Sequence, residues 1–229
     1  MKHVDLGGGT PVVFLHAGSG SSRMWQHQIP AFTDAGYRFI AYDRSGQAAA
    51  ADELEALAAH LGIERFHLVG TAAGGIVAVD YALSYPHRLR SLVIANSIVG
   101  VQDEDYLALG RRLRPAPHFS AMPAEFRELG PSYRAANPQG TRRWMELEQP
   151  IRALTTRNRI TFSLLETIKT PVLLLTGDAD LYTPPSVLRL FAARIGHAES
   201  VVIPECGHSA FWEQPETFNR VVLEFIGRH

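Results

Sequence analysis

The sequence of 229 residues is poor in cysteine, in excess charge of either sign and in long apolar runs. Its single cysteine, Cys206, excludes an internal disulfide. The 22 basic and 23 acidic residues give a net charge of -1, which argues against a surface that binds nucleic acid or an anionic membrane. No apolar run is long enough to span a bilayer, and residues 1–5 lack the apolar stretch of a secretion signal. We therefore expect a cytoplasmic protein with no nucleic-acid or membrane partner.

Short apolar runs alternate along the chain with amphipathic segments. The runs predict buried strands of a parallel sheet at residues 11–15, 38–42, 66–69, 91–95, 172–176 and 200–203. The spacing of apolar residues between them predicts three helices: one capped by Asp52 and ended by Gly62, one from Gly74 to Tyr85, and one that begins at Pro215. Alternating strands and helices with right-handed crossovers form a doubly wound sheet, whose ligand site lies outside the carboxyl ends of the strands.

The alternation breaks in the segment 102–166, which is rich in arginine, proline and aromatic residues. A segment of roughly 65 residues is too long for a plain connection, so we interpret it as an inserted cap over the strand ends. The remaining residues, 1–101 and 167–229, then form the core. The cap residues that we expect to line a pocket or to pack the cap against the sheet are Tyr106, Leu107, Leu113, His118, Phe119, Met122, Phe126, Tyr133, Trp144 and Met145.

Two segments of small residues follow predicted strands. In residues 16–20 small side chains allow backbone N–H groups to point into the crevice, as an oxyanion hole requires. Farther along, Gly70 and Gly74 flank Ala72 at the spacing of a strained strand-to-helix elbow, which presents a nucleophile. The G-x-S-x-G form of this motif has serine at its centre, whereas this chain has alanine. Neither segment matches a dinucleotide or phosphate motif, so we expect no cofactor.

An acidic segment and a histidine follow two later predicted strands. Asp178 and Asp180 come after the strand at 172–176, and His208 comes after the strand at 200–203. A carboxylate that orients an imidazole makes the histidine a usable base. Each pattern is common by itself, but an elbow, an acid and a histidine in this order on successive strand ends are far more specific. Asp178 is the acid that we expect to accept hydrogen bonds from the backbone of its own loop.

With these motifs the chain resembles the α/β-hydrolase fold family over nearly its whole length. The matching segments are residues 16–18, 42–46, 70–74, 177–180 and 207–208. The resemblance implies an α/β fold: a doubly wound, mostly parallel sheet flanked by helices, with a small inserted cap. It also implies an enzyme without a metal, monomeric or homodimeric, that hydrolyses an ester, a lactone or a C–C bond in a small carbonyl substrate.

The same resemblance assigns roles to single residues. Asp180 would be the acid and His208 the base of a catalytic triad, with Ala72 at the position of the nucleophile. The N–H groups of Gly18 and Ala73 would form the oxyanion hole, with Ala17 or Ser19 as alternatives to Gly18. Asp43 and Arg44 would brace their loop. Trp25 would lie near the mouth of the pocket, and the residues expected to contact the substrate are Trp25, Ser19, Thr71 and Trp144.

Ala72 is the main departure from the family pattern, because a methyl group cannot attack a carbonyl. Two explanations stay open: a deliberate change from serine to alanine, or a natural protein without the nucleophile. In the second case His208 and Asp180 still form a general base, which suits a lyase or a cofactor-free oxygenase. A third hypothesis is a sensor that binds a small ligand without catalysis. A further departure is the run after Arg44, where residues 45–51 form a connection that looks shortened.

Overall fold

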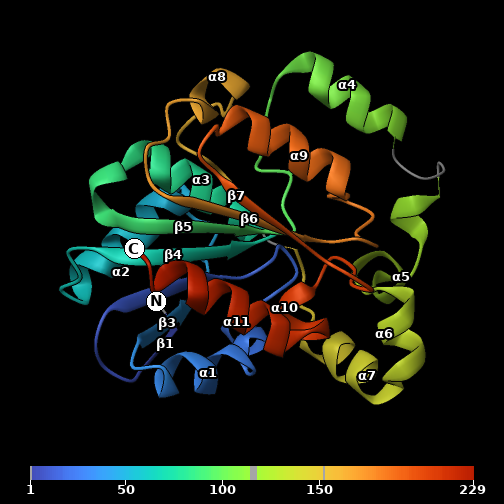
Figure 1. The fold of residues 1–229 in the computed structure, drawn as a ribbon, viewed down its shortest axis with the longest axis horizontal. Coiled ribbons are helices and arrows are strands. Elements are labelled where there is room, and N and C mark those ends of the chain that lie inside the picture. The colour runs from blue at the N-terminus through green and yellow to red at the C-terminus, as the bar shows by residue number, and fades with distance from the viewer. Residues whose placement is uncertain (1, 114–117, 152) are drawn as a thin grey trace.

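The computed structural model describes residues 2–113, 118–151 and 153–229. Within them one sheet has the strand order β1-β3-β2-β4-β5-β6-β7, and only β1 runs antiparallel to its neighbour, β3 (Figure 1). This confirms the predicted α/β fold. The strands are β1 (His3–Leu6), β2 (Pro11–Leu15), β3 (Arg38–Tyr42), β4 (Phe66–Thr71), β5 (Leu89–Ala95), β6 (Val172–Gly177) and β7 (Glu199–Ile203).

Helices cover both faces of the sheet (Figure 1). On one face, Val13 and Leu15 of β2 belong to an apolar cluster with residues of three helices, α2 (Ala50–His60), α3 (Ala73–Ser84) and α9 (Pro185–Arg194). On the other face, Val12 and Phe14 pack in a second cluster with residues of α1 (Gln28–Asp34), α10 (Ala210–Glu213) and α11 (Pro215–Ile226). Alternate residues of each strand point to opposite faces, so one short apolar strand contributes to both clusters.

The start of α2 differs from the prediction. The helix begins at Ala50, and Ala49, not Asp52, is its N-cap residue. The Asp52 carboxylate instead accepts hydrogen bonds from the Tyr85 hydroxyl at 2.9 Å and from Nη1 of Arg157 at 2.6 Å. The carboxylate of Glu53 accepts hydrogen bonds from the Ser45 N–H at 2.9 Å and from the Ser45 hydroxyl. That contact folds the short connection after β3 back onto the first turn of α2.

The residues between β5 and β6 form short helices in place of further strands. The green and yellow segments at the right of Figure 1 lie beyond one end of the sheet, and α7 contacts α10 through a hydrogen bond from Trp212 Nε1 to the Gly140 carbonyl (3.3 Å). The division of the chain into a core and a cap stays a prediction. The helices are α4 (Glu104–Leu113), η3 (Phe119–Ala121), α5 (Ala124–Glu128), α6 (Pro131–Ala136), α7 (Pro138–Leu147) and α8 (Phe162–Leu165), and η1 (Ser22–Trp25) and η2 (Pro86–Arg88) lie elsewhere.

Candidate functional site

Ala72 forms a strained turn between β4 and α3. Its backbone has φ of 49° and ψ of -116°, a conformation that alanine rarely adopts and that costs about 1–3 kcal/mol. The Ser97 hydroxyl donates to the Ala72 carbonyl at 2.6 Å. A side chain at Gly70 would collide with the backbone of Gly74, and one at Gly74 would collide with the Leu15 carbonyl. The elbow geometry is therefore complete although its apex carries only a methyl group.

Gly18 and Ala73, whose N–H groups are predicted to form an oxyanion hole, are neighbours in the structure. Ala73 is the first residue of α3, and the first N–H groups of a helix have no partner inside it. A Cβ built on Gly18 would lie 3.7 Å from the Ala73 Cβ. Nη2 of Arg44 donates to the Ala17 carbonyl at 3.1 Å, and the Asp43 carboxylate accepts from the Ser22 N–H at 2.7 Å. These contacts brace the loop, as predicted.

His208 and Asp180 form a buried pair where β7 and β6 end. The Nδ1 atom of His208 lies 2.9 Å from both carboxylate oxygens of Asp180. Asp180 also accepts from the Asn96 side chain at 3.0 Å and from the Thr176 hydroxyl at 3.0 Å. Two backbone N–H groups, those of residues 182 and 183, donate to it at 2.8 and 2.9 Å. Asp180 is 2% exposed and His208 is 7% exposed, so these bonds are protected from water.

The electrostatics of the pair follow from its burial and its bonds. Burial raises the pKa of Asp180, but the positive charge of His208 and the donated hydrogen bonds outweigh burial and lower that pKa below its ordinary value. Burial lowers the pKa of His208, yet the carboxylates of Asp180, Glu128 and Glu213 outweigh it and raise that pKa. An ionised Asp180 thus holds a proton on Nδ1, so Nε2 is the nitrogen that can exchange a proton with a substrate or water.

The remaining predicted substrate-binding residues lie in different surroundings. Trp25 is fully buried in the core, with its ring centroid 5.0 Å from that of Phe14, away from a pocket mouth. Trp144 is also buried, in the same apolar cluster. Thr71 is 1% exposed, and the described part of the chain offers its hydroxyl no hydrogen-bond partner. The Ser19 carbonyl accepts from the Gln149 N–H at 2.7 Å. Substrate contact by these residues stays a prediction.

Three residues that support the histidine were missed in the sequence. Asn96 donates to Asp180 and, at 3.1 Å, to the Gly207 carbonyl. The Glu213 carboxylate accepts from the backbone N–H groups of residues 130, 207 and 209 at 2.8, 2.9 and 3.1 Å. Glu128 places Oε2 3.9 Å from Nε2 of His208. Each contact joins segments that are far apart in the chain or follows a tight loop, so no local pattern marks it.

Two further side chains near the site, those of Cys206 and Asp178, are held in structural roles. Cys206 is fully buried, and burial followed by nearby carboxylates raises the pKa of its thiol well above the usual range. A thiol in that state is a poor nucleophile. Asp178 accepts from the backbone N–H of Cys206 at 3.2 Å, so its partner is a backbone group of the neighbouring loop, where we expected one of its own.

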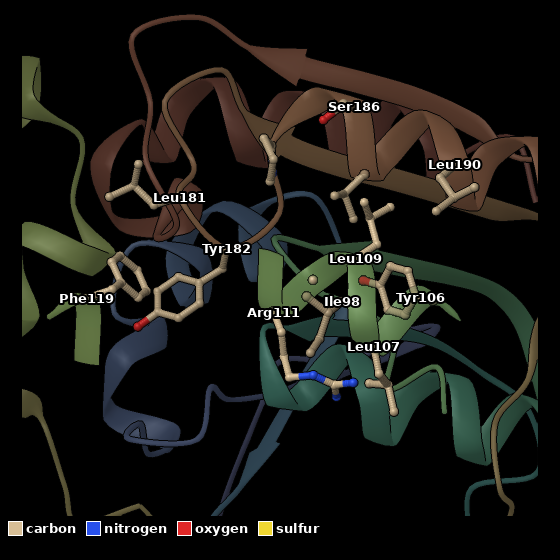
Figure 2. Close-up of a pocket in the computed structure, with 13 residues that line it drawn as sticks. Ile98, Tyr106, Leu107, Leu109, Arg111, Phe119, Leu181, Tyr182, Ser186 and Leu190 are labelled. Atoms are coloured by element: carbon tan, nitrogen blue, oxygen red, sulfur yellow. The ribbon is translucent and has the colours of Figure 1, made fainter. Parts of the chain in front are cut away.

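A largely apolar pocket of about 470 Å³ lies between α4 and α9 (Figure 2). Tyr106 and Leu107 of α4, with Phe119 of η3, line it as expected, whereas the side chain of Leu113 lies outside the described residues. Tyr182 also lines the pocket, and its ring centroid lies 4.5 Å from that of His208. The Tyr182 ring thus links the pocket to the histidine, although His208, Asp180 and Ala72 do not line it.

Comparison with known proteins decides the family. The model of the alpha/beta hydrolase family matches residues 12–221. The chain belongs to this family. An α/β-hydrolase from Burkholderia vietnamiensis, a 2-hydroxy-6-oxononadienedioate/2-hydroxy-6-oxononatrienedioate hydrolase, is 30% identical over 260 positions, with 96% of this chain and 88% of the relative covered.

Two further relatives extend the comparison. A 2-hydroxy-6-oxo-6-phenylhexa-2,4-dienoate hydrolase from Comamonas testosteroni is 28% identical over 271 positions, which cover 97% of this chain and 89% of the relative. That alignment is longer than the 229 residues of the chain, so the relative has residues that this α/β-hydrolase lacks. The crystal structure of a thermophilic esterase from Thermogutta terrifontis superposes with a TM-score of 0.84 at 26% identity, over 99% of this chain and 93% of its own.

The described residues offer neither a metal-binding cluster nor a membrane-spanning helix. Residues 2–113, 118–151 and 153–229 contain no cluster of three or more histidine, cysteine or acidic side chains arranged to hold a metal ion. No helix in the same part of the chain is long and apolar enough to cross a membrane.

Proposed function

We propose that this chain hydrolyses an ester, a lactone or a C–C bond in a small carbonyl compound, with a water molecule activated directly by His208. The observation that carries the proposal is the buried pair of His208 and Asp180, 2.9 Å apart, in a chain whose elbow residue is Ala72. Alanine cannot form an acyl intermediate, whereas an imidazole that is oriented by a carboxylate at Nδ1 remains a general base.

The reaction passes through one tetrahedral intermediate. Nε2 of His208 takes a proton from water while the water oxygen bonds to the carbonyl carbon. The carbonyl oxygen becomes an oxyanion that accepts hydrogen bonds from the N–H groups of Gly18 and Ala73. The bond to the leaving group then breaks, and the leaving group takes the proton back from the imidazolium. An ester yields an acid and an alcohol. A substrate that is cleaved at a C–C bond yields an acid and a second product whose carbon has gained the proton.

The relatives support a substrate class to test first. Two of them are named as hydrolases of 2-hydroxy-6-oxo-dienoates, compounds that carry a ketone and an enol. The apolar pocket that Tyr182 separates from His208 supports a substrate with an apolar substituent, because burial of apolar surface favours binding.

A second candidate function is a serine-independent lyase or a cofactor-free oxygenase. The absence of a nucleophile at Ala72 beside an intact His208 and Asp180 pair favours it, since such a pair is suited to remove a proton from an enolisable carbon or a phenolic hydroxyl. A non-catalytic sensor ranks third, because ligand binding alone does not require an oriented histidine.

The test compares the chain with its His208→Ala variant on short acyl esters, lactones and 2-hydroxy-6-oxo-dienoates. The proposal predicts turnover by the unchanged chain and a loss of about 10²–10⁴-fold in kcat for His208→Ala. The exposed His87 supplies the control, because His87→Ala leaves the rate unchanged. Equal rates for the chain and His208→Ala would contradict the proposal. Turnover that appears only in Ala72→Ser would instead identify an inactivated serine hydrolase.

A further inference from the structure

A second carboxylate faces His208 on the side opposite Asp180. Glu128 is the last residue of α5, and its Oε2 atom lies 3.9 Å from Nε2 of His208. Asp180 holds the other ring nitrogen at 2.9 Å. Nε2 is the nitrogen that must take the proton in the proposed reaction, and the elbow residue Ala72 offers it no hydroxyl. The imidazole therefore lies between two carboxylates from separate parts of the chain.

The position of Glu128 is fixed by contacts that need no substrate. The His208 N–H donates to the Glu128 carbonyl at 3.0 Å. The Tyr182 hydroxyl accepts from Nη1 of Arg127 at 2.7 Å, and burial followed by the Glu128 charge raises the pKa of Tyr182. Two residues after Glu128, the N–H of Gly130 donates to the Glu213 carboxylate, which also accepts from the Gly207 N–H in the loop of His208. These bonds hold the end of α5 against the histidine.

We propose, on the basis of the proposed function, that Glu128 is a second positioning residue for His208, which adds to Asp180 in favouring the doubly protonated imidazole and shifts the action of the ring as a base to higher pH. A carboxylate within about 4–6 Å favours the charged form of an imidazole. Glu128 and Asp180 each favour a proton on the ring nitrogen that they face. The base then becomes available only when the solution removes the Nε2 proton.

Other groups near the His208 ring also affect its pKa. Glu213 of α10 faces it as a third carboxylate, and the Tyr182 ring packs against it. Burial opposes the charge, but the carboxylates outweigh burial and raise the pKa of His208. Glu148 lies near Glu128, since burial and then the Glu128 charge raise its pKa, while Arg127 acts in the opposite sense on Glu148. Glu128 is the carboxylate that can be altered without loss of backbone hydrogen bonds to its side chain.

The expected pH effect follows from the sign of this interaction. Below the pKa of His208, the neutral fraction of the imidazole rises tenfold for each pH unit. Removal of the Glu128 charge lowers that pKa, by about one unit for a carboxylate at this range. Activity at pH 7 then rises roughly tenfold, and the limb of the profile on which activity rises with pH moves to lower pH by about one unit. The plateau at high pH does not rise, because a weaker base removes a proton less readily.

The experiment measures the titration of the His208 ring by NMR and the pH profile of kcat/KM in Glu128→Gln. Glu125→Gln is the matched control, because Glu125 lies on the same helix and has no contact with the His208 ring among the described residues. The proposal expects a His208 pKa lower by about one unit in Glu128→Gln and unchanged in Glu125→Gln, with faster turnover at pH 7 in the first variant.

The contrary result is a His208 pKa that is the same in both variants, which overturns the proposal at whatever rate they turn over substrate. A merely structural Glu128 would lower activity at every pH and leave the ring titration in place. The titration needs no substrate, so it decides the role of Glu128 even when the chain hydrolyses none of the compounds. A chain that hydrolyses none of the compounds, but whose His208 ring titrates as expected, contradicts the proposed function alone.

Discussion

The elbow and the acid–histidine pair differ in whether they combine the geometry of a catalytic site with its reactive side chains. At the elbow, Ala72 retains the strained backbone of a nucleophile turn and lacks the nucleophile. His208 and Asp180, in contrast, have both the hydrogen-bond geometry and the reactive groups of an acid–histidine pair. The elbow shape depends on Gly70, Gly74 and backbone contacts, so it survives without a reactive side chain. Under the proposed function, the chemistry of this chain therefore begins at the histidine.

The largest effect on stability is expected at Gly74, where the elbow lies closest to the sheet. In Gly74→Ala the new Cβ would overlap the Leu15 carbonyl, and backbone on both sides leaves no room to relax. We expect a loss of about 4 kcal/mol in the free energy of unfolding, measured by urea denaturation. Gly196→Ala, where nothing lies within 4 Å, is the control and stays within about 0.5 kcal/mol. Similar stability for both variants would show that the elbow is not tightly packed.

The next effect tests the support of the histidine loop. Glu213→Gln replaces a carboxylate that accepts three backbone N–H groups, and its amide NH₂ would face one of them. We expect a loss of about 2–3 kcal/mol, because buried N–H groups lose an ionised acceptor. Glu216→Gln, at an exposed position, should change little. Equal denaturation midpoints for the two variants would show that Glu213 does not support the loop of His208.

A smaller effect is expected at Asn96, which supports the acid. Asn96→Ala removes the donor to Asp180 and leaves alanine at a φ of 49°. We expect a loss of about 2 kcal/mol and slower turnover. Asn96→Gly separates the causes, since glycine accepts that backbone conformation and still lacks the amide. Turnover restored by glycine would mean that backbone strain, not the hydrogen bond, limits the alanine variant.

The smallest effect has the opposite sign. Ala72→Gly removes a Cβ from a backbone conformation that disfavours it, at a cost in entropy of the unfolded chain. We expect a net gain of about 1 kcal/mol in thermal or urea unfolding. A loss of stability would show that the Ala72 methyl packs well enough to offset the strain.

Local sequence predicted those parts of the fold and site that depend on short-range patterns. The strand at 38–42 and the helix that begins at Pro215 were found in this way, because buried apolar runs and a proline at the first helical turn are local signals. The antiparallel strand β1, residues 3–6, was missed, since it lies at the edge of the sheet and has no buried residue. Trp25 was placed at a pocket mouth, whereas its ring packs among core aromatics that come from distant segments.

The supports of the candidate site were not predictable for a related reason. Asn96 reaches Asp180 across 84 residues of sequence, and Glu213 reaches Gly130 across 83. Such contacts depend on the order of strands in the sheet and on the path of the chain between β5 and β6, neither of which a short pattern contains. His208 and Asp180 were predictable because both directly follow strands whose carboxyl ends meet at one edge.

The most direct test of the central claim compares kcat for Ala72→Gly and His208→Ala in one assay, on a substrate that the unchanged chain turns over. The account predicts that Ala72→Gly stays within about threefold of the unchanged chain, while His208→Ala falls by about 10²–10⁴-fold. The contrary result is a His208→Ala variant that keeps the rate of the unchanged chain, which would place the chemistry elsewhere than the histidine.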